Sequence, residues 1–174
     1  MNVGILVFDE VELLDMAGPY EVFTTAARVR ARSRPPGEPP AFVVTTIARH
    51  AGPVRARAGL RLQPDHVLGD HSHLDCAIVP GGVVDAALGH ADLMSWIADQ
   101  ARHARILASV CTGALLLAQA GVLDGLAATT HWEDLDALRA LRPGTQVREG
   151  VRWVDQGRIV TSAGIAAGID MSLH

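Results

Sequence analysis

The stretch around Cys111 has the pattern most suited to covalent chemistry. Residues 105–109 are expected to form a buried strand, and residues 114–120 a helix that begins almost immediately after it. A side chain at so sharp a turn projects above the carboxyl edge of a sheet, where α/β folds bind ligands, and Gly113 and Ala114 let the backbone pass closely. We therefore predict a nucleophile whose thiol pKa is lowered by the helix N-terminus. The alternative is a buried cysteine acting as a small apolar residue.

The elements that position this turn alternate between short β-branched runs and amphipathic stretches. Such alternation predicts an α/β sandwich, a mainly parallel sheet with helices on both faces. The expected strands are 3–8, 42–47, 54–62 (a strand or hairpin around Gly59), 74–79 and 105–109, and the expected helices begin at Gly18-Pro19, span 93–101 and span 114–120. Residues 9–15 and the Arg/Pro/Gly-rich segment 33–40 are expected to be loops.

Composition narrows the possible chemistry. The 174 residues are 49% hydrophobic and 20% charged, with a mean hydropathy of +0.21, which indicates one folded domain over residues 1–174. All 15 basic residues are arginine, which excludes P-loop, pyridoxal and Ser-Lys mechanisms. The net charge of −4 and the pI near 6.0 argue against nucleic-acid binding by this chain alone.

Neither a signal peptide nor a membrane span is expected. The first residues lack a basic segment and a cleavage site, so the cytoplasm is the default location. The longest uncharged run, 106–123, contains polar residues and is interpreted as a buried strand followed by a buried helix. With only Cys76 and Cys111 present, a disulfide framework is not expected.

Several motifs in a fixed order resemble the ThiJ/PfpI superfamily of class I glutamine amidotransferase-like proteins. These motifs are Pro80-Gly81-Gly82, the turn at Cys111, and the segments 121–132 (GVLDGLAATTHW) and 161–170 (TSAGIAAGID). Residues 14–23 (LDMAGPYEVF), taken with Cys111-Thr112-Gly113, are similar to the isocyanide hydratase branch and to the amidotransferase-like domains of AraC-type regulators.

This resemblance implies a flavodoxin-like sheet, a homodimer, and a reactive cysteine assisted by an acid from the loop after the first strand. Here that acid is Asp15. Its position is independently reasonable, because the loop after the first strand and the turn that carries Cys111 both lie at the carboxyl edge of the sheet. The implied reaction is hydration of an isocyanide to an N-substituted formamide, with Cys111 as nucleophile and Asp15 as acid and base. The alternative for Asp15 is a charge at a helix N-terminus.

Two departures disfavour other branches. Thr112 stands where the PfpI peptidases carry a histidine, and Asp15 stands where glyoxalase and deglycase relatives carry a glutamate. The backbone N–H of Thr112, together with Gly81 or Gly82, is expected to stabilise charge on the substrate, and the Thr112 hydroxyl to hold water. The alternative for the two glycines is a tight turn after a strand.

Other candidates are weaker. His131 is expected either to contact the catalytic residues without touching the substrate, or to be purely structural. The polar segment containing His66, His71, His73, Asp70 and Asp75 matches no zinc spacing, so neither a metal nor another cofactor is predicted. Cys76 and Trp96 are expected in the core.

The apolar pattern of residues 164–174 still runs at its last residue, so we expect this helix to continue in a longer chain. In AraC-type relatives a DNA-binding region follows this point. Two alternatives to the hydratase therefore stay open: a ligand-sensing domain of a transcription regulator, and a stress-response protein whose Cys111 is oxidised reversibly.

Overall fold

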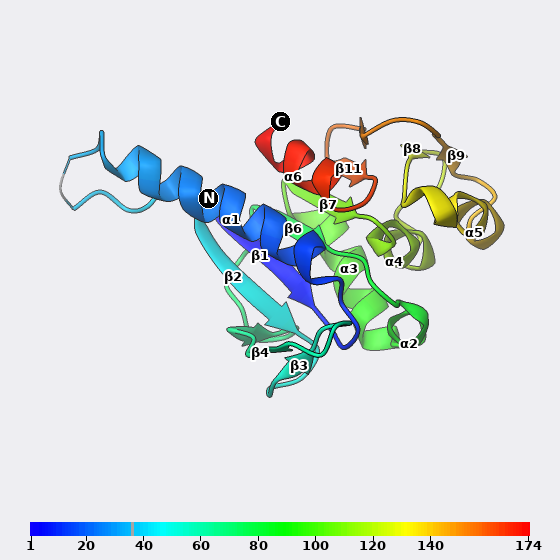
Figure 1. Ribbon diagram of the computed structural model, residues 1–174, viewed down its shortest axis with the longest axis horizontal. Helices are drawn as coiled ribbons and strands as arrows, with labels where there is room; N and C mark the ends of the chain where they lie inside the picture. Colours follow the sequence, from blue (N-terminus) through cyan, green and yellow to red (C-terminus); the bar gives the residue numbers. More distant parts are fainter. Residues whose placement is uncertain (36) are drawn as a thin grey trace.

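The computed structural model describes residues 1–35 and 37–174, so position 36 of the expected loop 33–40 lies outside the described residues. A seven-stranded sheet forms the centre of the molecule (Figure 1), in the order β10-β11-β7-β6-β1-β2-β5. All neighbouring pairs are parallel except β10 with β11. The strands are β1 (Asn2–Val7), β2 (Val43–Ala48), β5 (His66–Val67), β6 (Cys76–Val79), β7 (Ile106–Val110), β10 (Trp153–Asp155) and β11 (Ile159–Ser162).

The helices lie on both faces of this sheet. They are α1 (Leu13–Ala31), α2 (Asp85–Leu88), α3 (Ala91–His103), α4 (Gly113–Gln119), a 3-10 turn η1 (Trp132–Asp134), α5 (Leu135–Leu141) and α6 (Ala166–Leu173). The chain moves from β1 through α1 to β2 in one direction, and from β6 through α3 to β7 in the other. Because both crossovers are right-handed, α1 and α3 cover opposite faces. Helix α6 packs beside α1, and α4 beside α3.

The flavodoxin-like α/β prediction is confirmed by this topology. Strands β1, β6 and β7 are almost completely buried and supply most of the core, as their continuous apolar sequences predicted. The segment 54–62 forms the predicted hairpin, β3 (Val54–Arg55) with β4 (Arg61–Leu62), outside the main sheet. In its turn Gly59 has a φ of +92°, which glycine adopts without strain.

Several features differ from the expectations, and strands β10 and β11 of the central sheet were not anticipated. Helix α1 begins at Leu13 and not at Gly18-Pro19, because Leu13 and Met16 already pack on the core and Pro19 is accommodated inside the helix. Asp15 therefore belongs to the first turn of α1 and not to a loop. The polar segment before β6 contains β5, whose two residues extend the sheet beyond β2. A small parallel pair, β8 (Ala127–Ala128) with β9 (Gln146–Val147), was not anticipated.

No helix among the described residues is both long enough and apolar enough to cross a lipid bilayer. The uncharged run 106–123 contains β7 and α4, both buried, as expected. Cys76 and Trp96 are core residues, as predicted. The indole Nε1 of Trp96 donates a hydrogen bond to His71 Nε2 at 2.8 Å.

Candidate active site

Cys111 lies at a strained turn between β7 and α4. Its φ is +57°, in the left-handed region that non-glycine residues rarely adopt. Neighbouring segments hold this conformation: the Cys111 N–H donates to Ser162 O at 3.1 Å, and Thr130 Oγ1 donates to Cys111 O at 2.9 Å. Gly113 allows the close passage, because a Cβ there would lie 2.1 Å from Val79 O. The predicted sharp turn between strand and helix, the elbow, is therefore present.

The loops that follow β1 and β6 pair with each other beneath this turn. Glu12 N–H donates to Gly81 O at 2.8 Å, and Val83 N–H donates to Glu10 O at 3.0 Å. The backbone of Gly82 approaches the first loop so closely that a Cβ would lie 2.2 Å from Glu10 O. This pairing fixes the start of α1 against the elbow and brings Asp15 to Cys111.

Asp15 is completely buried next to the Cys111 thiol. Its Oδ1 accepts a hydrogen bond from the Ile165 N–H at 3.1 Å, whereas Oδ2 has no partner of good geometry among the described residues. Burial raises the pKa of the Asp15 carboxyl, and the Ile165 N–H and the thiol only partly oppose this effect. A buried carboxylate with a free oxygen beside a thiol is suited to moving a proton.

The expectation of a lowered thiol pKa is wrong. Burial, followed by the negative charge of Asp15, raises the pKa of Cys111 to about 12, although the Thr112 N–H favours the thiolate. Helix α4 has only seven residues, and its N-terminus does not overcome the desolvation. The resting group is therefore a thiol at neutral pH. The buried thiol of Cys76 also has a pKa raised to about 12.

Thr112, Gly81 and Gly82, which were predicted to donate hydrogen bonds to the substrate, make contacts that partly differ from this prediction. The Thr112 hydroxyl donates to Gly82 O, and the Gly82 N–H donates to Thr112 Oγ1, both at 2.9 Å. This hydroxyl therefore clamps the glycine loop to the elbow, and the Gly82 N–H is already occupied. Gly81 contacts the elbow so closely that a Cβ would lie 2.6 Å from Thr112 N. The Thr112 N–H remains available near the sulfur.

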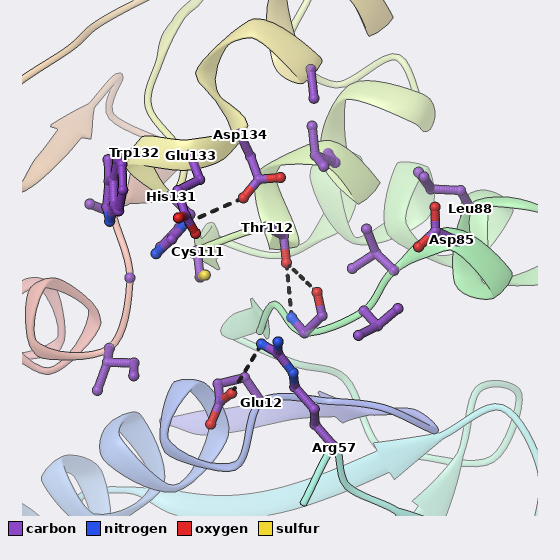
Figure 2. Close-up of a pocket in the computed structure, with 18 of the residues that line it drawn as sticks. Glu12, Arg57, Asp85, Leu88, Cys111, Thr112, His131, Trp132, Glu133 and Asp134 are labelled. Atoms are coloured by element: carbon purple, nitrogen blue, oxygen red, sulfur yellow. Dashed lines mark hydrogen bonds and ion pairs between the residues drawn. The ribbon is translucent and has the colours of Figure 1, made fainter.

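His131 lines the same cavity as Cys111 (Figure 2). Its Nδ1 lies 3.3 Å from Asp134 Oδ2, which orients the ring. A point beside Gly164, where a Cβ would stand, is 3.6 Å from Cys111 Sγ and 3.8 Å from His131 Nε2. The structure thus brings His131 to the edge of the reacting space.

The cavity above Cys111 has a volume of about 890 Å³. Its wall includes residues that the sequence did not single out, among them Arg57 of the β3–β4 hairpin and the strongly exposed Trp132. Ile165, which holds Asp15, has a φ of +33°, a strained value for a β-branched residue. Among these lining residues, only the His131-x-x-Asp134 spacing could have indicated a place at the site from the sequence. The sequence patterns around Arg57 and Ile165 do not indicate that these residues line a cavity.

No group of three or more His, Cys, Asp or Glu side chains among the described residues is arranged to hold a metal ion. The polar segment before β6 serves the fold instead. For example, Asp75 Oδ2 accepts a hydrogen bond from the Asn2 N–H at 2.7 Å.

Comparisons with known proteins agree with this geometry. Isonitrile hydratase of Pseudomonas putida is 36% identical over 174 residues, which cover 99% of this chain and 69% of the hydratase. The HTH-type transcriptional regulator GbdR of Pseudomonas aeruginosa is 31% identical over 173 residues, but the match covers only 45% of that regulator. The crystal structure of a ThiJ/PfpI family protein from Pseudomonas syringae superposes with a TM-score of 0.84 at 29% identity, covering 99% of this chain and 66% of that one.

The chain therefore spans about two thirds of the hydratase and less than half of the regulator. The model of the DJ-1/PfpI family matches residues 1–174. With this match and these relatives, the chain belongs to the DJ-1/PfpI family.

Proposed function

We propose that the protein is a cysteine-dependent hydratase that adds water to isocyanides and releases N-substituted formamides. The observation that carries this proposal is the pair formed by the Cys111 thiol and the buried Asp15, whose Oδ2 has no partner among the described residues. The 36% identity with isonitrile hydratase supports the same reaction class.

The reaction runs in two steps. The Cys111 sulfur attacks the terminal carbon of the isocyanide, and the thiol proton passes through Asp15 to that carbon, which leaves a thioimidate on the enzyme. Water then adds to the same carbon, and Asp15 accepts one of its protons while the substrate nitrogen takes up a proton from His131. The carbon–sulfur bond breaks, Asp15 returns its proton to the sulfur, the remaining hydroxyl proton restores His131, and the formamide leaves. One isocyanide and one water are consumed for each formamide.

The surrounding groups assist these steps. The Thr112 N–H lies near the sulfur and stabilises negative charge there. His131, oriented by Asp134, lines the same cavity and could donate a proton to the substrate nitrogen. Thr112 Oγ1 and Gly82 keep the elbow and the glycine loop in register.

A second candidate function is supported by the regulator GbdR, with which 173 residues align. In that case the same cavity would bind a ligand without turnover. Reversible oxidation of Cys111 is less well supported, because the thiolate is the form that oxidises and burial raises the pKa of this thiol to about 12.

The test is incubation of the purified protein with alkyl and aryl isocyanides while formamide is measured. Cys111→Ala should abolish turnover. Asp15→Asn, which keeps the size but cannot titrate, should reduce kcat about 10²–10⁴-fold with a smaller change in substrate binding. Asp15→Glu keeps the carboxyl but displaces it, so kcat should also fall.

Substrate binding without formamide by the parent protein would favour the sensing function. Equal turnover by Asp15→Asn and the parent would show that Asp15 is not the acid and base.

A further inference from the structure

The wall of the Cys111 cavity is predominantly acidic. It contains the carboxylates of Glu12, Asp85, Glu133 and Asp134. Arg57 supplies the one guanidinium among the described lining residues, and its Nη1 lies 3.8 Å from Glu12 Oε2. Figure 2 shows that the carboxylates enter from different sides: Glu12 from the loop before α1, Asp85 from α2, and Glu133 and Asp134 from the turn before α5. The space between them is therefore surrounded by negative charge.

These carboxylates are not there to cap helices. Asp85 begins α2 and Asp134 precedes α5, positions where an aspartate usually accepts hydrogen bonds from free N–H groups. Neither helix has a side-chain cap hydrogen bond. Asp134 lies instead 3.3 Å from His131 Nδ1, and Glu133 lies 3.7 Å from the same atom. Their charge is thus directed at the cavity and its wall.

A further feature of the same cavity points to a cationic ligand, independently of the acidic wall. At the rim, the Trp132 side chain is 72% exposed. The face of an exposed indole attracts cations.

We propose that this cavity selects molecules by charge, admitting to Cys111 those with a cationic substituent of the ammonium class and excluding those with a carboxylate or sulfonate. Carboxylates around a concave site focus the field and raise the local concentration of cations. Where the proposed hydratase function holds, on which this part rests, the substrate class is isocyanides whose substituent carries an ammonium group.

Methanethiosulfonates of matched size and opposite charge test this selection without relying on the hydratase reaction. The Cys111 sulfur, losing its proton to solvent, displaces methanesulfinate and forms a mixed disulfide. The rate of Cys111 modification is measured with the trimethylammonium reagent and with the sulfonate reagent, and each rate is divided by that of a small free thiol at the same pH. The ratio of the two normalised rates does not depend on the fraction of Cys111 that is thiolate. We expect this ratio to be about tenfold or more at low salt and to fall as salt is added. A ratio at or below that of the free thiol would overturn the proposal.

Charge-neutralising variants locate the effect. Glu133→Gln and Asp85→Asn should each lower the ratio about twofold, and Arg57→Gln should raise it. Glu21→Gln is the matched control, because Glu21 is an exposed carboxylate of α1 that does not line the cavity. Cys111→Ala identifies any reaction at Cys76. If Glu21→Gln changed the ratio as much as Glu133→Gln, net charge alone would be responsible and the proposal would fail.

A pair of isocyanides completes the test: one bearing a trimethylammonium group and one bearing a carboxylate on the same two-carbon spacer. We expect kcat/KM to favour the cationic compound about tenfold or more. Equal hydration of both would defeat charge selection and leave the hydratase intact. Hydration of neither, with the methanethiosulfonate ratio maintained, would defeat the hydratase and leave the selection of cationic ligands standing.

Discussion

The Cys111 thiol and the Asp15 carboxyl depend on each other because both are buried in one small space. Desolvation raises the pKa of each group, and the negative charge of Asp15 raises that of the thiol further. The pair therefore holds its proton until a substrate arrives. This differs from a nucleophile that rests as an exposed thiolate, because in the proposed reaction the strained elbow supplies position and Asp15 supplies the base.

The rate of Cys111 alkylation against pH measures this coupling. We expect the midpoint to lie well above ~8.5, the value of a free cysteine. In Asp15→Asn the midpoint should move down, because the negative charge that opposes the thiolate is gone. A parent midpoint at or below 8.5, or an upward shift in Asp15→Asn, would contradict the assignment. Cys111→Ala provides the background from Cys76.

The stability of the protein should also depend on Asp15. Its folded-state pKa is raised from 3.8, so below about pH 3.8 the carboxyl is protonated in both the folded and the unfolded states, without penalty. As the pH rises from there through the folded-state pKa, the unfolded state loses its proton first and the free energy of unfolding decreases. Asp15→Asn should therefore melt higher than the parent at neutral pH, by about 2–4 °C for each kcal/mol gained.

Thermal melts of the two proteins between pH 3.5 and 8 would measure this difference. The melting temperatures should converge at the acidic end. A lower melting temperature for Asp15→Asn at neutral pH would show that the ionised carboxylate stabilises the fold.

At the scale of elements, the sequence was sufficient where the signal is local or follows from sheet topology. The run into Cys111 predicted the elbow because an apolar strand and a helix with no room for a loop allow few other conformations. The pairing of Asp15 with Cys111 was predictable because parallel strands end at one edge. Gly113 and Ala114 were recognised correctly as the small residues of this turn.

The remaining errors have tertiary causes. The start of α1 was misplaced because Gly18-Pro19 is a good start signal, whereas packing of Leu13 and Met16 on the core determines where the helix begins. The direction of the Cys111 pKa was wrong because desolvation depends on segments such as 162–165, far away in the sequence. Arg57 reaches the cavity only because the β3–β4 hairpin folds back, with the Arg57 N–H bonded to Val11 O at 3.0 Å.

Alanine substitutions at two glycines should distinguish a glycine that holds the site together from one that borders the space for the substrate. In Gly81→Ala the new methyl would stand 2.6 Å from Thr112 N, against backbone that cannot move, so we expect both lower stability and lost activity. In Gly164→Ala the methyl would lie 3.6 Å from Cys111 Sγ and 3.0 Å from the edge of His131. Here the fold should survive while the methyl obstructs the reacting space.

Thermal melts and kcat/KM for both variants test this distinction. Gly164→Ala should retain most of its stability yet lose at least about tenfold in kcat/KM, because a small displacement of substrate is costly in a site of this kind. Unchanged activity in Gly164→Ala would place the reacting atoms elsewhere in the cavity.

At the scale of the whole molecule, apolar side chains are exposed around the mouth of the active site. Val83 is 40% and Ile165 39% exposed, and Trp132 is more so; all three line the cavity. Leu14, 50% exposed, directly precedes Asp15, whose Oδ1 accepts a hydrogen bond from the Ile165 N–H. Exposed apolar residues gathered at one place mark association surfaces.

We propose that two copies of the chain associate through this surface as a symmetric dimer. Sedimentation at micromolar concentration should give twice the mass of the chain. Leu14→Glu places a charge on the proposed contact and should weaken the dimer, whereas Val29→Glu, at an exposed apolar position near the other end of α1, serves as the matched control. A monomeric parent, or equal weakening by both variants, would refute this contact. If Leu14→Glu also lowers kcat/KM only at concentrations where the dimer has dissociated, the second copy completes the site.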